Sequence, residues 1–224
     1  MLNSFADVAY NVKHRSVVVF YEWVCEPALD VNSFYRHPFI SNHYEATLLC
    51  HCVTTGNPEL VQVCLTQRPE ADPNLGYRWS NGPRAKVTPM FVRACSKGKH
   101  AYAIMLLLLA HGATPDQSAL DEALKEAVWP LNVECVRWLL EHGANPNTGD
   151  DDSFPPLLLL LYRWEESRAN EFVDAARLLL KHGADPTRTC RNPFYDGNWR
   201  RYLRRECHNA EKAEEYIKLI EADE

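Results

Sequence analysis

The stretch of sequence that decides the fold is residues 134–147, which read E-C-V-R-W-L-L-E-H-G-A-N-P-N. Within it, Val136, Leu139 and Leu140 recur at helical spacing, so one apolar stripe can face a neighbouring element. Gly143 then provides the left-handed conformation that closes a helix, which glycine adopts without a Cβ penalty. The N-P-N turn that follows cannot continue the helix. The stretch therefore predicts an amphipathic helix with a defined end.

The same ending recurs at residues 70–74 (E-A-D-P-N), 110–116 (A-H-G-A-T-P-D) and 181–187 (K-H-G-A-D-P-T), and in a decayed form at residues 27–32. The turn prolines lie 42, 31 and 40 residues apart, at Pro73, Pro115, Pro146 and Pro186. A period near about 33 residues, lengthened by insertions, is typical of a solenoid built from helical hairpins.

These repeats resemble the ankyrin-repeat family, which opens each repeat with Thr-Pro-Leu-His and ends it with Leu-Leu-x-x-Gly-Ala. Residues 88–91 (T-P-M-F) are the opening nearest to that pattern, and residues 47–50, 118–121 and 155–157 depart further from it. The likeness covers roughly residues 45–187 and fades on either side. It implies an all-α fold, an ankyrin-repeat solenoid of helix-turn-helix units with β-turn or hairpin fingers.

The repeat pattern predicts how the chain is organised. Terminal repeats have one open face and are expected to depart from the pattern, because an uncovered end exposes apolar surface. Residues 1–44 are predicted to form a degenerate capping repeat followed by an aromatic-rich loop, and residues 191–224 a helical cap. The core repeats are predicted within residues 45–190, at about 45–87, 88–117, 118–152 and 153–190.

Composition favours one compact intracellular unit. The chain has 224 residues, 46% of them apolar, and a net charge of −6, which argues against nucleic-acid binding. Its longest leucine runs are too short to span a bilayer, and its start lacks a basic segment followed by an apolar run. The eight cysteines could form disulfides, but they are scattered at helix positions in a chain that is not small. Reduced thiols in the cytoplasm or nucleus are the interpretation that we adopt.

Two short clusters could suggest a metal site. Cys50-His51-Cys52 offers potential zinc ligands, but no second pair stands at finger-like spacing, and adjacent helical residues point in different directions. Residues 150–152 are three aspartates that could bind a cation or form a solvated acidic finger, and they lack the glycine and distal glutamate of a calcium loop. The sequence predicts neither a metal nor a cofactor.

Two sets of basic residues also need an interpretation. His111, His142 and His182 precede the three Gly-Ala pairs, and their recurrence predicts bonds to helix-end carbonyls rather than catalysis. Four arginines could bind phosphate or an acidic partner, or they could pair with neighbouring carboxylates. These arginines and carboxylates are Arg200, Arg201, Arg204, Arg205, Glu206, Glu211, Glu214 and Glu215.

Two classes of function stay open. The resemblance implies a non-catalytic interaction module that binds a protein or peptide through a groove formed by its first helices and fingers, and we expect a monomer. The alternative is an enzyme or small-molecule binder that uses the groove as a pocket, although no catalytic motif is present. The predicted groove residues are Tyr77, Arg78, Trp79, Phe91, Arg93, Asp121, Lys125, Trp129, Tyr162 and Trp164.

Some of these candidates have a second interpretation. Tyr77 and Trp79 alternate with Arg78 as in a short strand beside a turn, so the rings could pack on the repeats or contact a partner. Phe91 could belong to ordinary packing between repeats.

Overall fold

The structure is a computed structural model, and it describes residues 30–36, 44–79, 87–149, 153–188, 199–207 and 209–221. The chain divides into two compact units, Met1–Ala119 and Leu120–Glu224, whereas its composition favoured one. In a repeat array each repeat contacts only its neighbours, so one chain can form more than one compact unit. Most of the predicted capping repeat and aromatic-rich loop of residues 1–44 lies outside the described residues, as do the turn after Trp79 and the three aspartates at 150–152.

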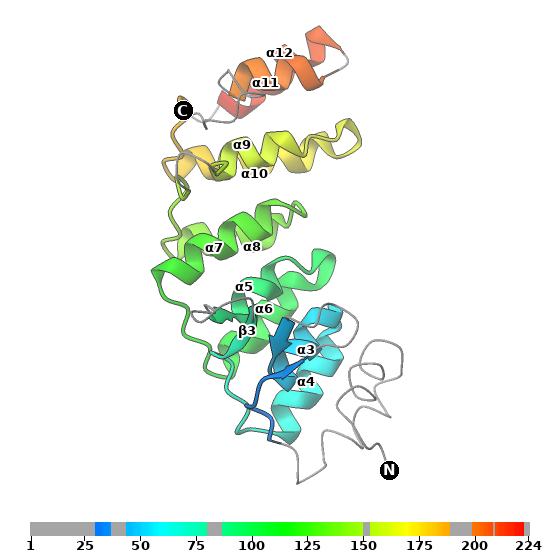
Figure 1. Ribbon diagram of the computed structural model, residues 1–224. Coiled ribbons are helices and arrows are strands. Elements are labelled where there is room, and N and C mark those ends of the chain that lie inside the picture. Colours follow the sequence, from blue (N-terminus) through cyan, green and yellow to red (C-terminus); the bar gives the residue numbers. More distant parts are fainter. Residues whose placement is uncertain are drawn as a thin grey trace. The chain divides into compact units, whose positions relative to one another are not determined.

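In the first unit the helices pair two by two (Figure 1). Helix α3 (Leu48–Thr55) packs on α4 (Pro58–Gln67), and α5 (Met90–Cys95) packs on α6 (Ala101–Ala110), with the 3-10 helix η1 (Gly98–His100) between the last two. Because α3 also contacts α5 and α4 contacts α6, the two hairpins stack with equivalent helices together.

Local sequence explains where the first hairpin turns. Thr47 begins α3, because its side-chain oxygen accepts a hydrogen bond from the backbone N–H of Cys50 at 3.3 Å. Gly56, at φ 71°, ends that helix in the left-handed conformation. Asn57 then caps α4, which starts with Pro58 at its first position.

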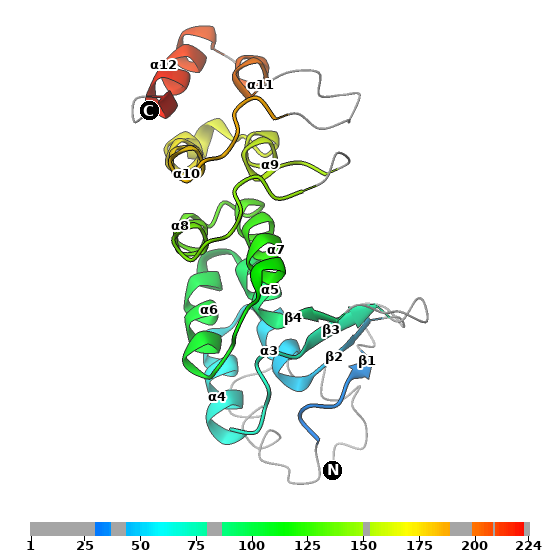
Figure 2. The same cartoon turned by 90° about the vertical axis from the view of Figure 1, so that its left-hand side faces the viewer.

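A small antiparallel sheet completes the first unit, in the order β1-β2-β3-β4. Figure 2 shows its strands extending from α3 and α5 on the side away from α4 and α6. The pair β3–β4 is a hairpin finger of the kind that the resemblance implies. An aromatic-rich loop was predicted where strand β1 lies. The strand forms there because its backbone pairs with β2 in an extended conformation. The strands are β1 (Tyr35–Arg36), β2 (Tyr44–Ala46), β3 (Gly76–Trp79) and β4 (Val87–Pro89).

The second unit continues the helical pairing. Helix α10 contacts α8, α9 and α12, and α11 contacts α9 and α12. In Figure 2 the second helices α8, α10 and α12 lie on one side of this unit, and the first helices α7, α9 and α11 lie on the other. The elements are α7 (Gln117–Val128, which starts in the first unit), α8 (Val133–Glu141), α9 (Pro156–Tyr162), η2 (Glu166–Arg168), α10 (Ala169–Lys181), α11 (Trp199–Glu206) and α12 (Ala210–Glu221).

The helix ending predicted at Gly143 is confirmed. Gly143 has φ 90°, its N–H donates to the Leu140 carbonyl at 3.2 Å, and the Ala144 N–H donates to the Leu139 carbonyl at 2.9 Å. This pair of bonds is the Schellman motif, and it satisfies carbonyls that the end of the helix leaves free. The endings at Gly112 and Gly183 have the same two bonds and φ values of 93° and 87°.

Gly143→Val should therefore destabilise the protein by about 2–3 kcal/mol, because a β-branched residue is strained at positive φ. No described atom lies within 4 Å of a Cβ built at Gly143, so the expected cost is conformational rather than steric. Gly143→Asn is the matched control and should lose less than about 1 kcal/mol, since asparagine tolerates this region. Chemical-denaturation midpoints measure both, and equal losses for valine and asparagine would contradict the assignment.

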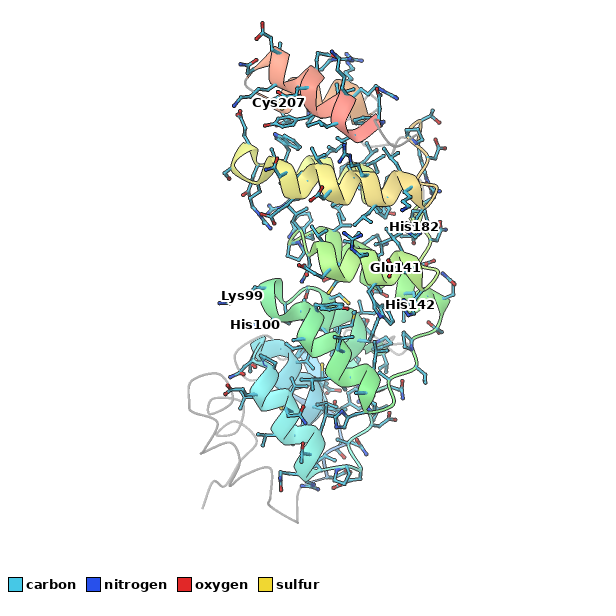
Figure 3. All side chains as sticks on the ribbon, turned by 180° about the vertical axis from the view of Figure 1, so that it is seen from behind. Lys99, His100, Glu141, His142, His182 and Cys207 are labelled. Carbon is cyan, nitrogen blue, oxygen red and sulfur yellow. The ribbon has the colours of Figure 1, made fainter. Side chains whose placement is uncertain are left out.

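The predicted role of the histidines is also confirmed for two of them. His111 Nδ1 lies 2.9 Å from the Leu107 carbonyl oxygen, and His142 Nδ1 lies 2.7 Å from that of Trp138. The His142 ring also stacks on the Trp138 ring. Figure 3 shows His142 at the end of α8 and His182 at the end of α10.

Asparagine side chains link successive turns within each unit. Asn74 Oδ1 accepts from the Thr114 N–H at 2.8 Å, and its Nδ2 donates to the Gly112 carbonyl at 3.2 Å. Asn32 and Asn147 form the same pair of bonds to the turns that follow them. One side-chain amide thus satisfies a donor and an acceptor of the neighbouring turn.

The C-terminal arginines pair with carboxylates, which supports the second of their two interpretations. Arg200 lies 2.5 Å from Glu221, Arg204 lies 2.5 Å from Glu214, and Arg205 lies 2.9 Å from Glu206. Glu214 and Glu206 were among the expected partners, whereas Glu221 was not.

No helix in the described ranges has the length and apolar character needed to cross a membrane.

Candidate partner-binding surface

Four side chains gather at the exposed surface of α7 and α9 in the second unit. Trp129 directly follows α7 and is 47% exposed, and Tyr162 ends α9 and is 43% exposed. Their ring centroids are 6.4 Å apart, and the Tyr162 ring stacks on that of Phe154 at 5.6 Å. The guanidinium carbon of Arg163 lies 4.7 Å from the centroid of the Trp129 ring. We call Phe154, Trp129, Tyr162 and Arg163 the aromatic patch.

The end of α7 places Trp129 at the surface. Pro130 disfavours the helical conformation of the residue before it, so the helix stops at Val128. Leu131 then has φ 59°, a left-handed conformation that is rare for leucine. Its N–H donates to the Val128 carbonyl at 3.0 Å, and the next N–H, of Asn132, donates to the Ala127 carbonyl at 2.9 Å. The Leu131 side chain is buried, which helps to offset the strained backbone.

The short helix α9 places Tyr162 by its periodicity. Its leucines at 157, 158, 160 and 161 are buried, so the exposed side of the helix falls at Leu159 and Tyr162. These two residues are three positions apart and share one helical face. Arg163 immediately follows the helix, where its N–H donates to the Leu160 carbonyl at 3.2 Å.

Two cations border the exposed tryptophan. Lys125 lies one helical turn before Trp129, and Arg163 lies over the ring. Across the described ranges, neither side chain has a hydrogen bond or an ion pair. Asp121 is different, because its Oδ1 accepts a hydrogen bond from the Asn145 N–H at 2.8 Å. That bond turns the face shared by Asp121 and Lys125 toward the turn that contains Asn145.

Two predicted groove residues are packing residues. Phe91 is 1% exposed, so the structure contradicts its assignment as a partner contact and supports its interpretation as packing. Trp164 packs on Phe172 and Tyr216, with ring centroids 5.2 Å from each, and its indole nitrogen is buried. The surface assignment of Trp164 is therefore corrected: its ring sits at the contact between α10 and α12, where its main effect is on stability.

The finger candidates of the first unit are also engaged with neighbouring side chains. Tyr77 stacks on Tyr44 at 5.4 Å, so this ring packs back on the sheet. Arg78 forms an ion pair with Glu45 at 2.8 Å and lies 4.6 Å from the centroid of the Phe34 ring. The side chain of Trp79 lies outside the described residues.

A buried polar cluster in the first unit bears on the enzyme alternative. Tyr44 Oη lies 3.9 Å from Cys50 Sγ, and the His51 ring contacts the Tyr44 ring edge to face at 6.3 Å. Burial raises the pKa of the Cys50 thiol to about 11, although the hydrogen bond with Tyr44 and the charge of Arg93 lower it. A thiol with so high a pKa is protonated at neutral pH and is a poor nucleophile. The predicted groove residue Arg93 is half-buried, and its Nε atom is buried without a hydrogen-bond partner among the described residues.

A cleft of about 200 Å³ in the first unit is lined by the turns around Asn74 and Asp116. Its polar groups already serve the fold, because Asn74 bonds to Thr114 and Asp116 Oδ1 accepts from the Ala119 N–H at 2.8 Å. Within the described ranges, no three His, Cys, Asp or Glu side chains are grouped for a metal. The cysteines of these ranges are free and buried: Cys50, Cys52, Cys64, Cys95, Cys135 and Cys207.

Arg163 and Phe154 are the members of the aromatic patch that the sequence did not identify. Arg163 adjoins the predicted Tyr162, but its position over a ring 34 positions earlier in the chain depends on the packing of α9 beside α7. Phe154 precedes α9 and reaches Tyr162 because that helix is only 7 residues long. Among the predicted residues, the structure brings together Trp129 and Tyr162, and Lys125 lies one helical turn before Trp129.

Residues 49–150 match a family model described as ankyrin repeats in three copies. No curated protein sequence matches the chain. The fold is similar to that of an ankyrin repeat domain from Acinetobacter baumannii AYE, with 17% identity, 98% of both chains covered and a TM-score of 0.61.

Two further solved structures are similar at 17% identity. The human ASB11 ankyrin repeat domain covers 90% of this chain and 98% of its own, with a TM-score of 0.43. The Legionella pneumophila effector AnkC covers 92% of this chain and 64% of its own, with a TM-score of 0.46.

Proposed function

We propose, from the premise that this chain is an ankyrin-repeat protein, that it is a non-catalytic module that binds a protein or peptide partner. Ankyrin-repeat domains are typically protein–protein interaction modules. The observation that carries the proposal is the aromatic patch, in which Trp129 and Tyr162 keep 47% and 43% of their surface exposed. Tryptophan, tyrosine and arginine are the residues that most often dominate the binding energy of an interface.

The patch belongs to the first-helix side of the second unit, which Figure 2 shows opposite α8 and α10. Trp129 and Tyr162 come from two successive repeats, so one partner segment could contact both. The second-helix side offers the exposed Arg137 and Glu141 as a comparison surface, and Figure 3 shows Glu141 at the end of α8.

Two further properties are part of this proposal. Free buried thiols are typical of proteins in reducing compartments, which supports a location in the cytoplasm or nucleus. A net charge of −6 supports a protein rather than a nucleic acid as the partner. The enzyme alternative gains no support from the buried polar cluster, because its Cys50 thiol is held protonated.

The proposal predicts a separation between binding and stability. Trp129→Ala and Tyr162→Ala should each weaken partner binding by about 1–2 kcal/mol, because each removes an exposed aromatic contact. Each should leave the melting temperature nearly unchanged, since about half of each side chain is already in water. The partner would be isolated by crosslinking and affinity purification from the native cell, and its Kd measured with purified variants.

Arg137→Ala and Glu141→Ala on α8 are the controls and should change neither binding nor melting. If the α8 pair weakens binding and the aromatic pair does not, the proposed face is wrong. If no variant that stays folded changes the affinity, the aromatic patch is not the binding site.

A further inference from the structure

We propose that the aromatic patch, together with Lys125, binds an extended acidic, proline-containing segment of a partner protein. This inference rests on the proposed function, and it adds the chemical class of the segment that would be recognised. Three features of the second unit support it: an oriented guanidinium, a second uncommitted cation, and a cluster of three aromatic rings.

The oriented group is Arg163. Its guanidinium carbon lies 4.7 Å from the centroid of the Trp129 ring, so the indole holds the cation through its face. Its side chain has no hydrogen bond or ion pair within the described ranges, which leaves its N–H donors available. The planar guanidinium matches a carboxylate with two parallel hydrogen bonds, and an arginine that is already oriented loses less entropy in forming them.

Lys125 adds a second positive charge beside the same ring. It lies four residues before Trp129 and four residues after Asp121, whose carboxylate bonds to the turn that contains Asn145. The acidic residues nearest to Lys125 on α7 are Asp121, Glu122 and Glu126, and Glu165 follows α9. Asp121 and Glu122 lie on the same side of the helix as Lys125, but Asp121 already bonds to Asn145 and Glu122 also has a partner, whereas Glu126 is displaced by about 100° around the helix. Two uncommitted cations at the ring therefore favour an acidic partner.

The rings provide the apolar part of the surface. The centroids of Trp129 and Tyr162 are 6.4 Å apart, and those of Tyr162 and Phe154 are 5.6 Å apart. A polyproline II segment has three residues per turn and rises about 3.1 Å per residue, so two of its three edges can contact one surface. Proline-rich segments dock on aromatic-lined surfaces in this conformation, which they adopt before binding and at low entropic cost. A segment that contains both prolines and acidic residues would thus offer prolines to the rings and a carboxylate to Arg163.

The test uses synthetic ten-residue peptides added to the full chain. One alternates glutamate and proline, and its neutral twin alternates glutamine and proline. The readout is the indole N–H signal of Trp129 in a two-dimensional NMR titration, identified by its loss in Trp129→Phe. We expect the glutamate peptide to shift this signal saturably at millimolar or lower concentration, and the glutamine peptide to bind at least about fivefold more weakly, as the loss of a charge-assisted hydrogen bond implies. Added salt should weaken the glutamate peptide.

Matched arginine variants test the role of the guanidinium. Arg163→Gln should lose most of the preference for glutamate over glutamine, whereas Arg137→Gln on α8 should keep it, and both keep the reporting indole. The inference is overturned by equal binding of the two peptides, by the absence of a saturable shift, or by equal behaviour of the two arginine variants. Tighter binding of an oligo-dT strand at Trp129 would also overturn it, since bases stack on aromatic rings too. If the glutamate peptide fails while the isolated partner still depends on Trp129 and Tyr162, the proposed function holds and this inference alone fails.

Discussion

Replacing Gly76 with alanine is expected to destabilise the first unit by about 3 kcal/mol or more, at the upper end of the range for overpacking. A Cβ built at Gly76 would lie 1.9 Å from the carbonyl oxygen of Thr88 and 2.8 Å from the nitrogen of Met90. Both are backbone atoms, so no side chain can rotate to make room. The strands β3 and β4 would have to separate at the position where Met90 N–H donates to the Leu75 carbonyl at 3.2 Å.

Gly98→Ala is the control for Gly76→Ala. Gly98 has φ 59° and no described atom within 4 Å of a built Cβ, so it should lose only the cost of a left-handed alanine, about 1–2 kcal/mol. Chemical denaturation followed by circular dichroism compares the two variants. A Gly76→Ala midpoint equal to that of the unmodified protein would show that β3 and β4 do not pair in the register described.

Trp199→Ala is expected to cost about 3–5 kcal/mol, the range for removing a large buried aromatic side chain. Trp199 is 0% exposed, and it lies on α11, which packs on α9 and α12. Removing its ring leaves a cavity under the C-terminal helices and deprives Arg200 of a ring 4.8 Å from its guanidinium carbon. Hydrogen exchange of α11 and α12 should accelerate more than that of α8, because the lost contacts are at this end of the unit.

Trp199→Phe distinguishes the contribution of the ring's volume to stability from that of its indole N–H. The indole nitrogen of Trp199 is buried and has no hydrogen-bond partner in the described part of the chain. Phenylalanine keeps most of the apolar contact and removes that unsatisfied donor, so it should cost less than about 1.5 kcal/mol. Equal losses for alanine and phenylalanine, or no loss for either, would contradict the packing assigned to Trp199.

The sequence by itself determined where helices begin and end. The ending at Gly143 depends on bonds to carbonyls within five residues, and on the left-handed φ that glycine adopts without strain. The break between α3 and α4 follows from residues 56–58, G-N-P, in the same way. These features were predictable because each involves neighbours along the chain. The spacing of the repeats then predicted that these helices form a stack of helical hairpins.

The tertiary structure alone decided which aromatic side chains face solvent. Trp129 and Trp164 are the same residue type, and both flank first helices, yet one is 47% exposed and the other packs between Phe172 and Tyr216. Burial of a ring depends on what lies beside it, and those neighbours come from repeats tens of residues away. The position of Arg163 over Trp129 and the pairing of β1 with β2 also depend on the folded arrangement of the chain. Sequence patterns report contacts along the chain, whereas the candidate surface consists of contacts between repeats, which exist only after the helices have packed.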